Sequence, residues 1–220
     1  MRDKHRVLAA ALGALLMARG GVGRSDPAPN QGAQGSASAR YRIDAAKSRF
    51  VVETETSSLA LMFAHDHRIE AREFSGVAKF NPAGRGTASL ELTVRADSLR
   101  LLEEKTIADR AAIENALRED VLETVKYPEI SFKSRAVTFE RRGDGTYDAR
   151  LTGDLRLHGV RRAVTIPARI ALEPDALHAI GIFEIRQSDF NMTPFSFVKG
   201  AVVIKDAVTI SFDIIASRLP

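Results

Sequence analysis

The feature that most constrains the fold is an alternation of apolar and polar residues through most of the chain from Tyr41 onward. In the stretch 88–96, apolar residues occupy the even positions and polar or charged residues occupy the odd ones. The same period of two recurs in 149–157, 164–172 and 208–214. Because successive side chains of a strand point to opposite faces, this pattern predicts strands with one apolar face. Turn-forming Gly, Pro, Asn and Asp residues separate the stretches, which favours an antiparallel sheet.

One segment, from Leu99 to Lys126, departs from this period. Its apolar residues recur at helical spacing among many charges, and Pro128 follows the segment. We therefore expect one helical segment, in one or two pieces, inserted after the first strands. The interleaved acidic and basic residues are typical of a solvated helix face. This is too little helix for alternating strands and helices, so a parallel sheet is not expected.

A sheet with one apolar face must cover that face, and one helical segment is too small to do so. We therefore expect an all-β fold in which the sheet curls into a closed antiparallel barrel. About eight strands enclose an interior that is either filled by side chains or holds one small ligand. The predicted inward residues are mixed in size, with large Phe132 and Phe183 alongside small Gly153, Ala168 and Gly181. Both a solid core and a ligand cavity fit this mixture.

The N-terminus has the layout of an export signal. Basic residues precede an uncharged apolar run from Val7 to Ala18, and we interpret residues 1–23 as a signal peptide. As a helix this run is only about 18 Å long, too short to span a bilayer. Residues 24–40 are rich in Gly, Ser, Ala, Pro and Gln and are predicted to form a flexible linker. We expect a periplasmic or secreted protein whose mature form has no transmembrane segment.

The formal net charge of +4 belongs to the N-terminus alone. Residues 1–24 hold five Lys or Arg and one Asp, so the remaining 196 residues carry 27 positive and 27 negative charges. A neutral domain offers no global field for nucleic acid, and we expect no nucleic-acid partner. The chain has no Cys, which excludes disulfides and thiol chemistry.

Short motifs along the barrel region occur in a familiar order. They are Tyr41-x-Ile43-Asp44, Ser48-x-Phe50, Phe74-Ser75-Gly76, Asp120-Val121-Leu122, Tyr127 to Ser134, Gly153 to Val160, and Ile185 to Phe190. Together they resemble the YceI-like family over residues 41–217. The resemblance implies an eight-stranded antiparallel barrel similar to lipocalins, with the helical segment against one end. It also implies a periplasmic protein that holds a polyisoprenoid-type chain and has no catalytic residues.

If an apolar tail occupies the barrel, inward-facing side chains must line it. The residues that we expect to contact the ligand are Phe132, Leu151, Leu155, Ile166, Ile170, Phe183, Ile210 and Phe212. The expected partner is an amphiphilic lipid, such as an isoprenoid quinone or another prenyl lipid, and no other cofactor is expected. A barrel that serves as an interaction module without a ligand is a further hypothesis. No feature of the sequence specifies an oligomeric state.

The sequence also offers an alternative function, that of a metal-binding protein or a metal-dependent enzyme. His65 and His67 flank Asp66, and in a strand their imidazoles would lie on one face, where two can share a zinc or copper ion. A third ligand must come from elsewhere, and the remaining histidines of this region are His158 and His178. Both are expected to face solvent, His158 at a turn. The competing interpretation of His65 and His67 is a polar rim at the mouth of the barrel.

Overall fold

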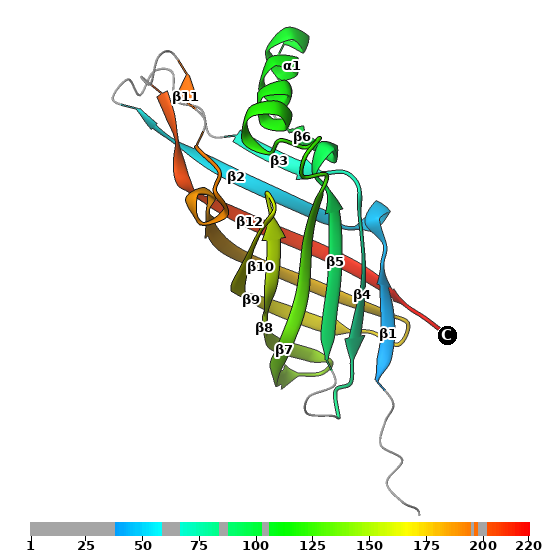
Figure 1. Ribbon diagram of the computed structural model, residues 1–220. Helices are drawn as coiled ribbons and strands as arrows, with labels where there is room; N and C mark the ends of the chain where they lie inside the picture. Colours follow the sequence, from blue (N-terminus) through cyan, green and yellow to red (C-terminus); the bar gives the residue numbers. More distant parts are fainter. Residues whose placement is uncertain (1–37, 59–66, 84–87, 103–105, 195, 198–201) are drawn as a thin grey trace, which may run out of the picture. The chain divides into compact units, whose positions relative to one another are not determined.

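The computed structural model describes residues 38–58, 67–83, 88–102, 106–194, 196–197 and 202–220 (Figure 1). The signal peptide and most of the linker predicted from the sequence lie outside these ranges. The elements in chain order are β1 (Ala39–Ile43), η1 (Ala45–Lys47), β2 (Arg49–Ser58), β3 (His67–Ala71), β4 (Phe74–Phe80), β5 (Ser89–Arg95), η2 (Ala96–Ser98), β6 (Leu99–Leu101), α1 (Ile107–Ala116), η3 (Leu117–Val121), β7 (Glu129–Gly143), β8 (Thr146–Leu157), β9 (Val160–Leu172), β10 (Ala176–Arg186), η4 (Gln187–Phe190), β11 (Ser196–Phe197) and β12 (Val202–Arg218).

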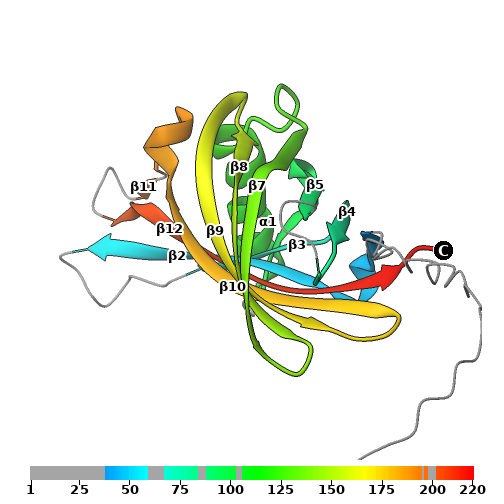
Figure 2. The ribbon, with the colours of Figure 1, turned by 90° about the horizontal axis from the view of Figure 1, so that it is seen from below.

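Eight strands form a closed ring, as the alternation predicted. Their order is β1, β4, β5, β7, β8, β9, β10 and β12, and pairing between β1 and β12 closes the ring. Strands β2, β3 and β6 extend from β12 beside this ring, and β2 continues the line of β1 along β12. Figure 2 views the molecule from below and shows the strands following one another around the barrel axis. Every ladder in the ring is antiparallel, which confirms the predicted fold class.

The core lies where the apolar faces of these strands meet inside the barrel. In β8 every second residue from Tyr147 to Leu157 is buried, while Arg150, Thr152 and Arg156 are exposed. Leu155 is the register partner of Phe132 in β7, so two large apolar side chains share one rung of the inner face. The geometry of the strands therefore directs these side chains into the barrel.

The helical segment begins later than predicted. Leu99–Leu101 is the short strand β6 rather than helix, because Leu99 and Leu101 are buried and pair with Ala71 and Ile69 of β3. Helix α1 begins after Thr106, whose hydroxyl accepts a hydrogen bond from the Asp109 backbone N–H.

A buried carboxylate attaches α1 to β6. Glu114 of the helix accepts a 3.0 Å hydrogen bond from the backbone N–H of Leu101. Arg110 of α1 in turn donates to the Leu101 carbonyl. The helix therefore covers one end of the barrel, as the sequence analysis expected (Figure 1).

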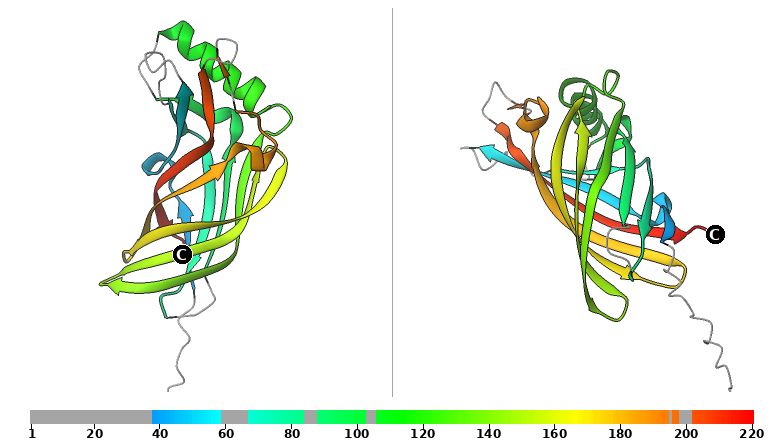
Figure 3. Two further views of the ribbon diagram at one scale, coloured as in Figure 1. Left: turned by 90° about the vertical axis from the view of Figure 1, so that its left-hand side faces the viewer. Right: turned by 60° about the horizontal axis from the view of Figure 1, so that its bottom comes forward.

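The opposite end carries the β7–β8 and β9–β10 hairpins (Figure 3). Aromatic rings pack there against the end of β4. The Phe80 ring lies 4.8 Å from that of Phe139 and 5.1 Å from that of Tyr147, measured between centroids. Phe80 is only 2% exposed. This cluster fills the barrel at the end remote from α1.

Candidate ligand cavity

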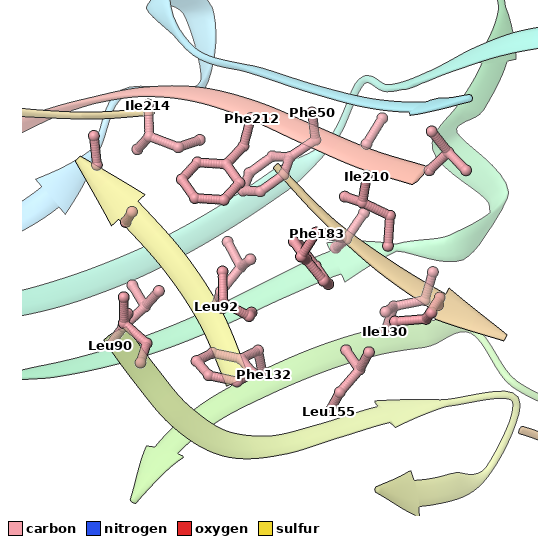
Figure 4. Close-up of a pocket in the computed structure, with 18 of the residues that line it drawn as sticks. Phe50, Leu90, Leu92, Ile130, Phe132, Leu155, Phe183, Ile210, Phe212 and Ile214 are labelled. Atoms are coloured by element: carbon pink, nitrogen blue, oxygen red, sulfur yellow. The ribbon is translucent and has the colours of Figure 1, made fainter. Parts of the chain in front are cut away.

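An apolar cavity of about 250 Å³ runs through the barrel interior. All eight residues predicted to contact a ligand line it, together with side chains from β2, β4, β5 and β12. Figure 4 shows Phe132, Leu155, Phe183, Ile210 and Phe212 of this set around the cavity. The walls are almost wholly hydrocarbon, and the few polar lining residues include Thr54, Lys79, Ser89 and Gln187. Such a space suits an apolar chain rather than a polar substrate.

The small inward residues do not by themselves create this cavity. A Cβ atom at Gly153 would overlap the neighbouring backbone and the Phe132 ring, and one at Gly181 would overlap the Phe212 ring. These glycines therefore make room for the aromatic rings. The interior is thus neither a solid core nor an empty barrel, because large and small residues interdigitate and a cavity remains between them.

Phe50 is a cavity-lining residue that the sequence analysis did not select. It lies on β2, where its ring packs edge-on against Phe74 at 5.0 Å and lies 6.1 Å from the Phe212 ring. Alternation could not single it out, because Phe50, Val51 and Val52 form an unbroken apolar run and Val51 is itself buried. The site therefore includes an aromatic wall formed by β2, β4 and β12.

Two buried polar residues lie at the part of the cavity wall formed by β2 and η4. Thr54 is 9% exposed and Gln187 is 6% exposed. The Gln187 side-chain amide donates a 3.0 Å hydrogen bond to the Lys205 carbonyl. The apolar lining near Gln187 includes Met192, which follows η4. The mostly apolar lining therefore contains these two buried polar side chains.

The histidine pair proposed as a metal site is only half described. His67 begins β3, where Thr54 is its register partner and donates a 3.4 Å side-chain hydrogen bond to its carbonyl. His67 shares its strand parity with the cavity-lining residues Ile69 and Ala71. His65 lies outside the described residues. Across the described part of the chain, no cluster of three or more His, Cys, Asp or Glu side chains is placed to hold a metal.

His158 does not face solvent, contrary to the expectation from strand parity. Its side chain is 10% exposed, and its ring packs 4.4 Å from the Tyr127 ring. The Nε2 atom lies 2.8 Å from a Glu123 carboxylate oxygen, and Nδ1 lies 3.2 Å from the Phe190 carbonyl. The reason is the turn: His158 has a φ of 49°, so strand parity no longer determines where its side chain points.

Two left-handed residues, Glu123 and His158, meet at this contact, and a third lies beside it. Among the described residues, the only positive-φ residues other than glycine are Glu123, His158 and Asn191. Asn191 follows Phe190 directly and caps η4. Such conformations persist where surrounding contacts hold them. We call this group of Glu123, Tyr127, His158 and Phe190 the clasp, because it joins the segment after η3, the β8–β9 turn and η4.

The clasp gives a stability prediction. His158→Ala removes two hydrogen bonds and a ring contact, and leaves the Phe190 carbonyl without its partner. We expect the free energy of unfolding, measured in urea, to fall by about 2 kcal/mol. The matched control is His178→Ala, because His178 is 38% exposed and pairs with Asp213 on the outer surface. That variant should change stability by no more than about 0.5 kcal/mol; equal losses in the two variants would show that the clasp has no special role.

Asp189 belongs to a hydrogen-bonded turn after β10. It lies in η4, and its backbone carbonyl accepts a 2.8 Å hydrogen bond from Arg162. The neighbouring Ser188 bonds both oxygens of Asp206 through its hydroxyl and backbone N–H. These hydrogen bonds lower the pKa of Asp206. The segment is thus a turn-stabilising network.

A closed, eight-stranded antiparallel barrel around an apolar cavity defines a lipocalin-like binding architecture. The family comparison agrees with it. The model of the YceI-like domain matches residues 41–216, and the chain belongs to the YceI-like family.

One curated relative and several solved structures are similar to this chain. A UPF0312 protein of Pseudomonas putida (strain W619) is 30% identical over 133 residues, which span 59% of this chain and 61% of that protein. BcnA of Burkholderia cenocepacia has a TM-score of 0.61 at 22% identity, covering 79% of this chain and 98% of that one. A polyisoprenoid-binding domain from Saccharophagus degradans, implicated in plant cell wall breakdown, has a TM-score of 0.56 at 13% identity, covering 81% and 98%. The YceI protein of Campylobacter jejuni has a TM-score of 0.53 at 19% identity, covering 69% and 85%. At these identities the solved structures establish the fold.

In the part of the chain that the structure describes, no helix is both long enough and apolar enough to span a bilayer.

Proposed function

We propose that this protein binds the tail of a polyisoprenoid or a similar amphiphilic lipid inside the barrel. The observation that carries the proposal is the hydrocarbon lining of the cavity, with aromatic rings from several strands and few polar groups. Transfer of an apolar tail from water into such a space gains about 0.8 kcal/mol for each buried methylene. Family membership and the polyisoprenoid-binding domain of similar fold support the same ligand class.

The ligand is oriented by the polar residues of the lining. Thr54 and Gln187 offer hydrogen-bonding groups to a quinone or alcohol headgroup, while the tail extends toward Phe80. The volume of about 250 Å³ lies below the range of roughly 300–1,000 Å³ found for pockets of drug-sized ligands. A slim, flexible chain fits this space better than a wide ring system.

The proposed role is that of a binding or carrier protein for such a lipid after export. The signal peptide predicted for residues 1–23 supports a periplasmic or secreted location. A prenyl lipid cannot cross an aqueous compartment unaided, because its tail is poorly soluble in water. An exported barrel that encloses the tail would solve this problem.

A chain-length series tests the proposal. We expect the affinity for prenyl alcohols of increasing length, measured by native mass spectrometry, to rise at least tenfold for each added isoprene unit until the cavity is full. Beyond that length the affinity should level off. An affinity that is independent of chain length would contradict tail burial in the cavity, and so would saturation by a short polar alcohol.

A further inference from the structure

The ladder between β9 and β10 joins only the last four residues of β9 to the start of β10. Register partners join Arg169–Leu172 to Leu177–Ile180, whereas β10 continues to Arg186 and pairs there with β12. The Pro167 carbonyl points at Gly181, close enough that a Cβ there would overlap it. In a strand, the N–H and carbonyl of one residue point to the same side. Pro167 therefore presents to β10 a nitrogen with no hydrogen to donate, which explains where the ladder ends.

The outer surface is hollowed at this break. A concavity of about 840 Å³ is lined by Arg142, Arg150, Pro167, Arg169, Ile180 and Ile182. Phe212 lines both this concavity and the interior cavity. Ala168 also lines both, so the two hollows adjoin at Ala168 and Phe212.

The concavity exposes apolar side chains. Ile180 is 41% exposed and Ile182 is 59% exposed, and both alternate outward along β10. They are two of only four large hydrophobic side chains that are exposed among the described residues. Because both line the same concavity beside the break in the ladder, they form an exposed apolar patch.

The wall beside them is basic. Residues 129–172, which form β7, β8 and β9, hold nine Lys and Arg but five Asp and Glu, whereas β10 and β12 together hold three of each. Both acidic residues of the concavity are already paired. Asp148 bonds Arg142 at 2.6 Å and lies 3.5 Å from Arg169, and Glu140 lies 3.5 Å from Arg142. The hydrogen bond from Arg142 lowers the pKa of Asp148, which keeps this pair ionised. Arg150 has no ion-pair partner in the described part of the chain.

A second pair of arginines extends this basic wall. Arg156 and Arg161 are exposed and directly opposite each other in the β8–β9 register, and no acidic residue pairs with either among the described residues. Like charges that face each other across a ladder destabilise the sheet. An anionic partner on this surface would remove that repulsion.

We propose that the outer face of β8, β9 and the first half of β10 docks onto an anionic phospholipid bilayer. Arg150, Arg156 and Arg161 contact lipid phosphates, and the concavity receives a headgroup. Ile180 and Ile182 enter the boundary between headgroups and tails. This places the break between β9 and β10 against the membrane, beside the cavity. This docking rests on the proposed function, because a lipid carrier must meet the membrane from which it takes its ligand.

Vesicle sedimentation tests the docking surface independently of any bound ligand. We expect the folded protein to sediment with phosphatidylcholine vesicles that contain about one third phosphatidylglycerol, and not with phosphatidylcholine alone. Arg150→Glu should weaken this binding on the order of tenfold. The double variant Ile180→Ser with Ile182→Ser should weaken it severalfold at unchanged charge. Inorganic phosphate at millimolar concentration should not release the protein, which separates a bilayer from a small-anion site.

The control is Arg42→Glu, an equal change of charge at an exposed residue of β1. It should bind the anionic vesicles within about twofold of the unchanged protein, as electrostatic attraction falls off within a Debye length. The proposal would be overturned if Arg42→Glu and Arg150→Glu lost equal affinity for the anionic vesicles. Full release of the protein by phosphate would also overturn it, as would binding to heparin as tight as binding to the vesicles. Circular dichroism confirms that each variant is folded. If the protein binds the vesicles but its affinity for prenyl alcohols does not depend on chain length, the docking surface is supported and the proposed ligand is contradicted.

Discussion

Ala179→Phe should abolish binding of the lipid tail while the barrel remains folded. Ala179 is an inward residue of β10 that lines the cavity, and its register partner Ile170 lies across the ladder in β9. A phenyl ring there occupies the space that a chain would fill. Because the interior contains a cavity, the ring should lower the free energy of unfolding by less than the 1–3 kcal/mol typical of overpacking a solid core. We expect at least a hundredfold loss of affinity for the longest prenyl alcohol, measured by native mass spectrometry.

The matched control is Ala136→Phe. Ala136 is an exposed residue of β7, so the same change adds a ring on the outside of the barrel. This variant should bind the prenyl alcohol within about twofold of the unchanged protein. If Ala179→Phe binds the lipid as well as Ala136→Phe does, the tail does not lie in the cavity. If both variants lose binding, the effect of Ala179→Phe does not depend on the interior.

Phe80→Ala should cause the largest loss of stability among these variants. Phe80 is 2% exposed, and its ring contacts both Phe139 and Tyr147. Truncation of a buried phenylalanine typically costs about 3–5 kcal/mol, from lost transfer free energy and from the cavity left behind. Urea unfolding monitored by circular dichroism measures this cost.

Ile182→Ala serves as the control for Phe80→Ala. It also truncates a large apolar side chain in a strand, but Ile182 is 59% exposed. Its cost should stay within about 0.5 kcal/mol. A loss for Phe80→Ala as small as that for Ile182→Ala would mean that the aromatic cluster does not hold this end of the barrel together.

The barrel itself was predictable, because its strands obey the period-two pattern on which the prediction rested. The alternation in 149–157 assigned the inward residues of this part of β8 correctly, and all eight residues predicted to contact a ligand line the cavity. Long ladders with one buried face leave little freedom of register. Contact between those residues and a ligand stays a prediction.

The errors lie where local pattern and tertiary context disagree. Leu99–Leu101 was assigned to the helix, but pairing with β3 makes it a strand. His158 obeys strand parity in the sequence, yet a positive φ at the turn directs its ring into the clasp. Gln187 gave no periodic signal, because it lies in η4 between two strands. Such positions depend on contacts between distant segments, which a pattern within one segment does not encode.

The break between β9 and β10 is an intermediate case. A proline inside a strand predicts a missing hydrogen bond, and Pro167 was visible in the alternating stretch 164–172. Which neighbouring strand loses the bond depends on the side to which the Pro167 carbonyl points, and that required the structure. The predicted signal peptide and His65 lie outside the described residues.

The most direct test of the central claim is the mass of the native protein purified from its own host. Native mass spectrometry under gentle conditions should show the processed chain with one added mass, and organic extraction should release a prenyl lipid of that mass. Ala179→Phe prepared in the same way should show the chain alone. A native protein that carries no added mass, or one whose added mass is a metal ion or a polar molecule, would contradict the account.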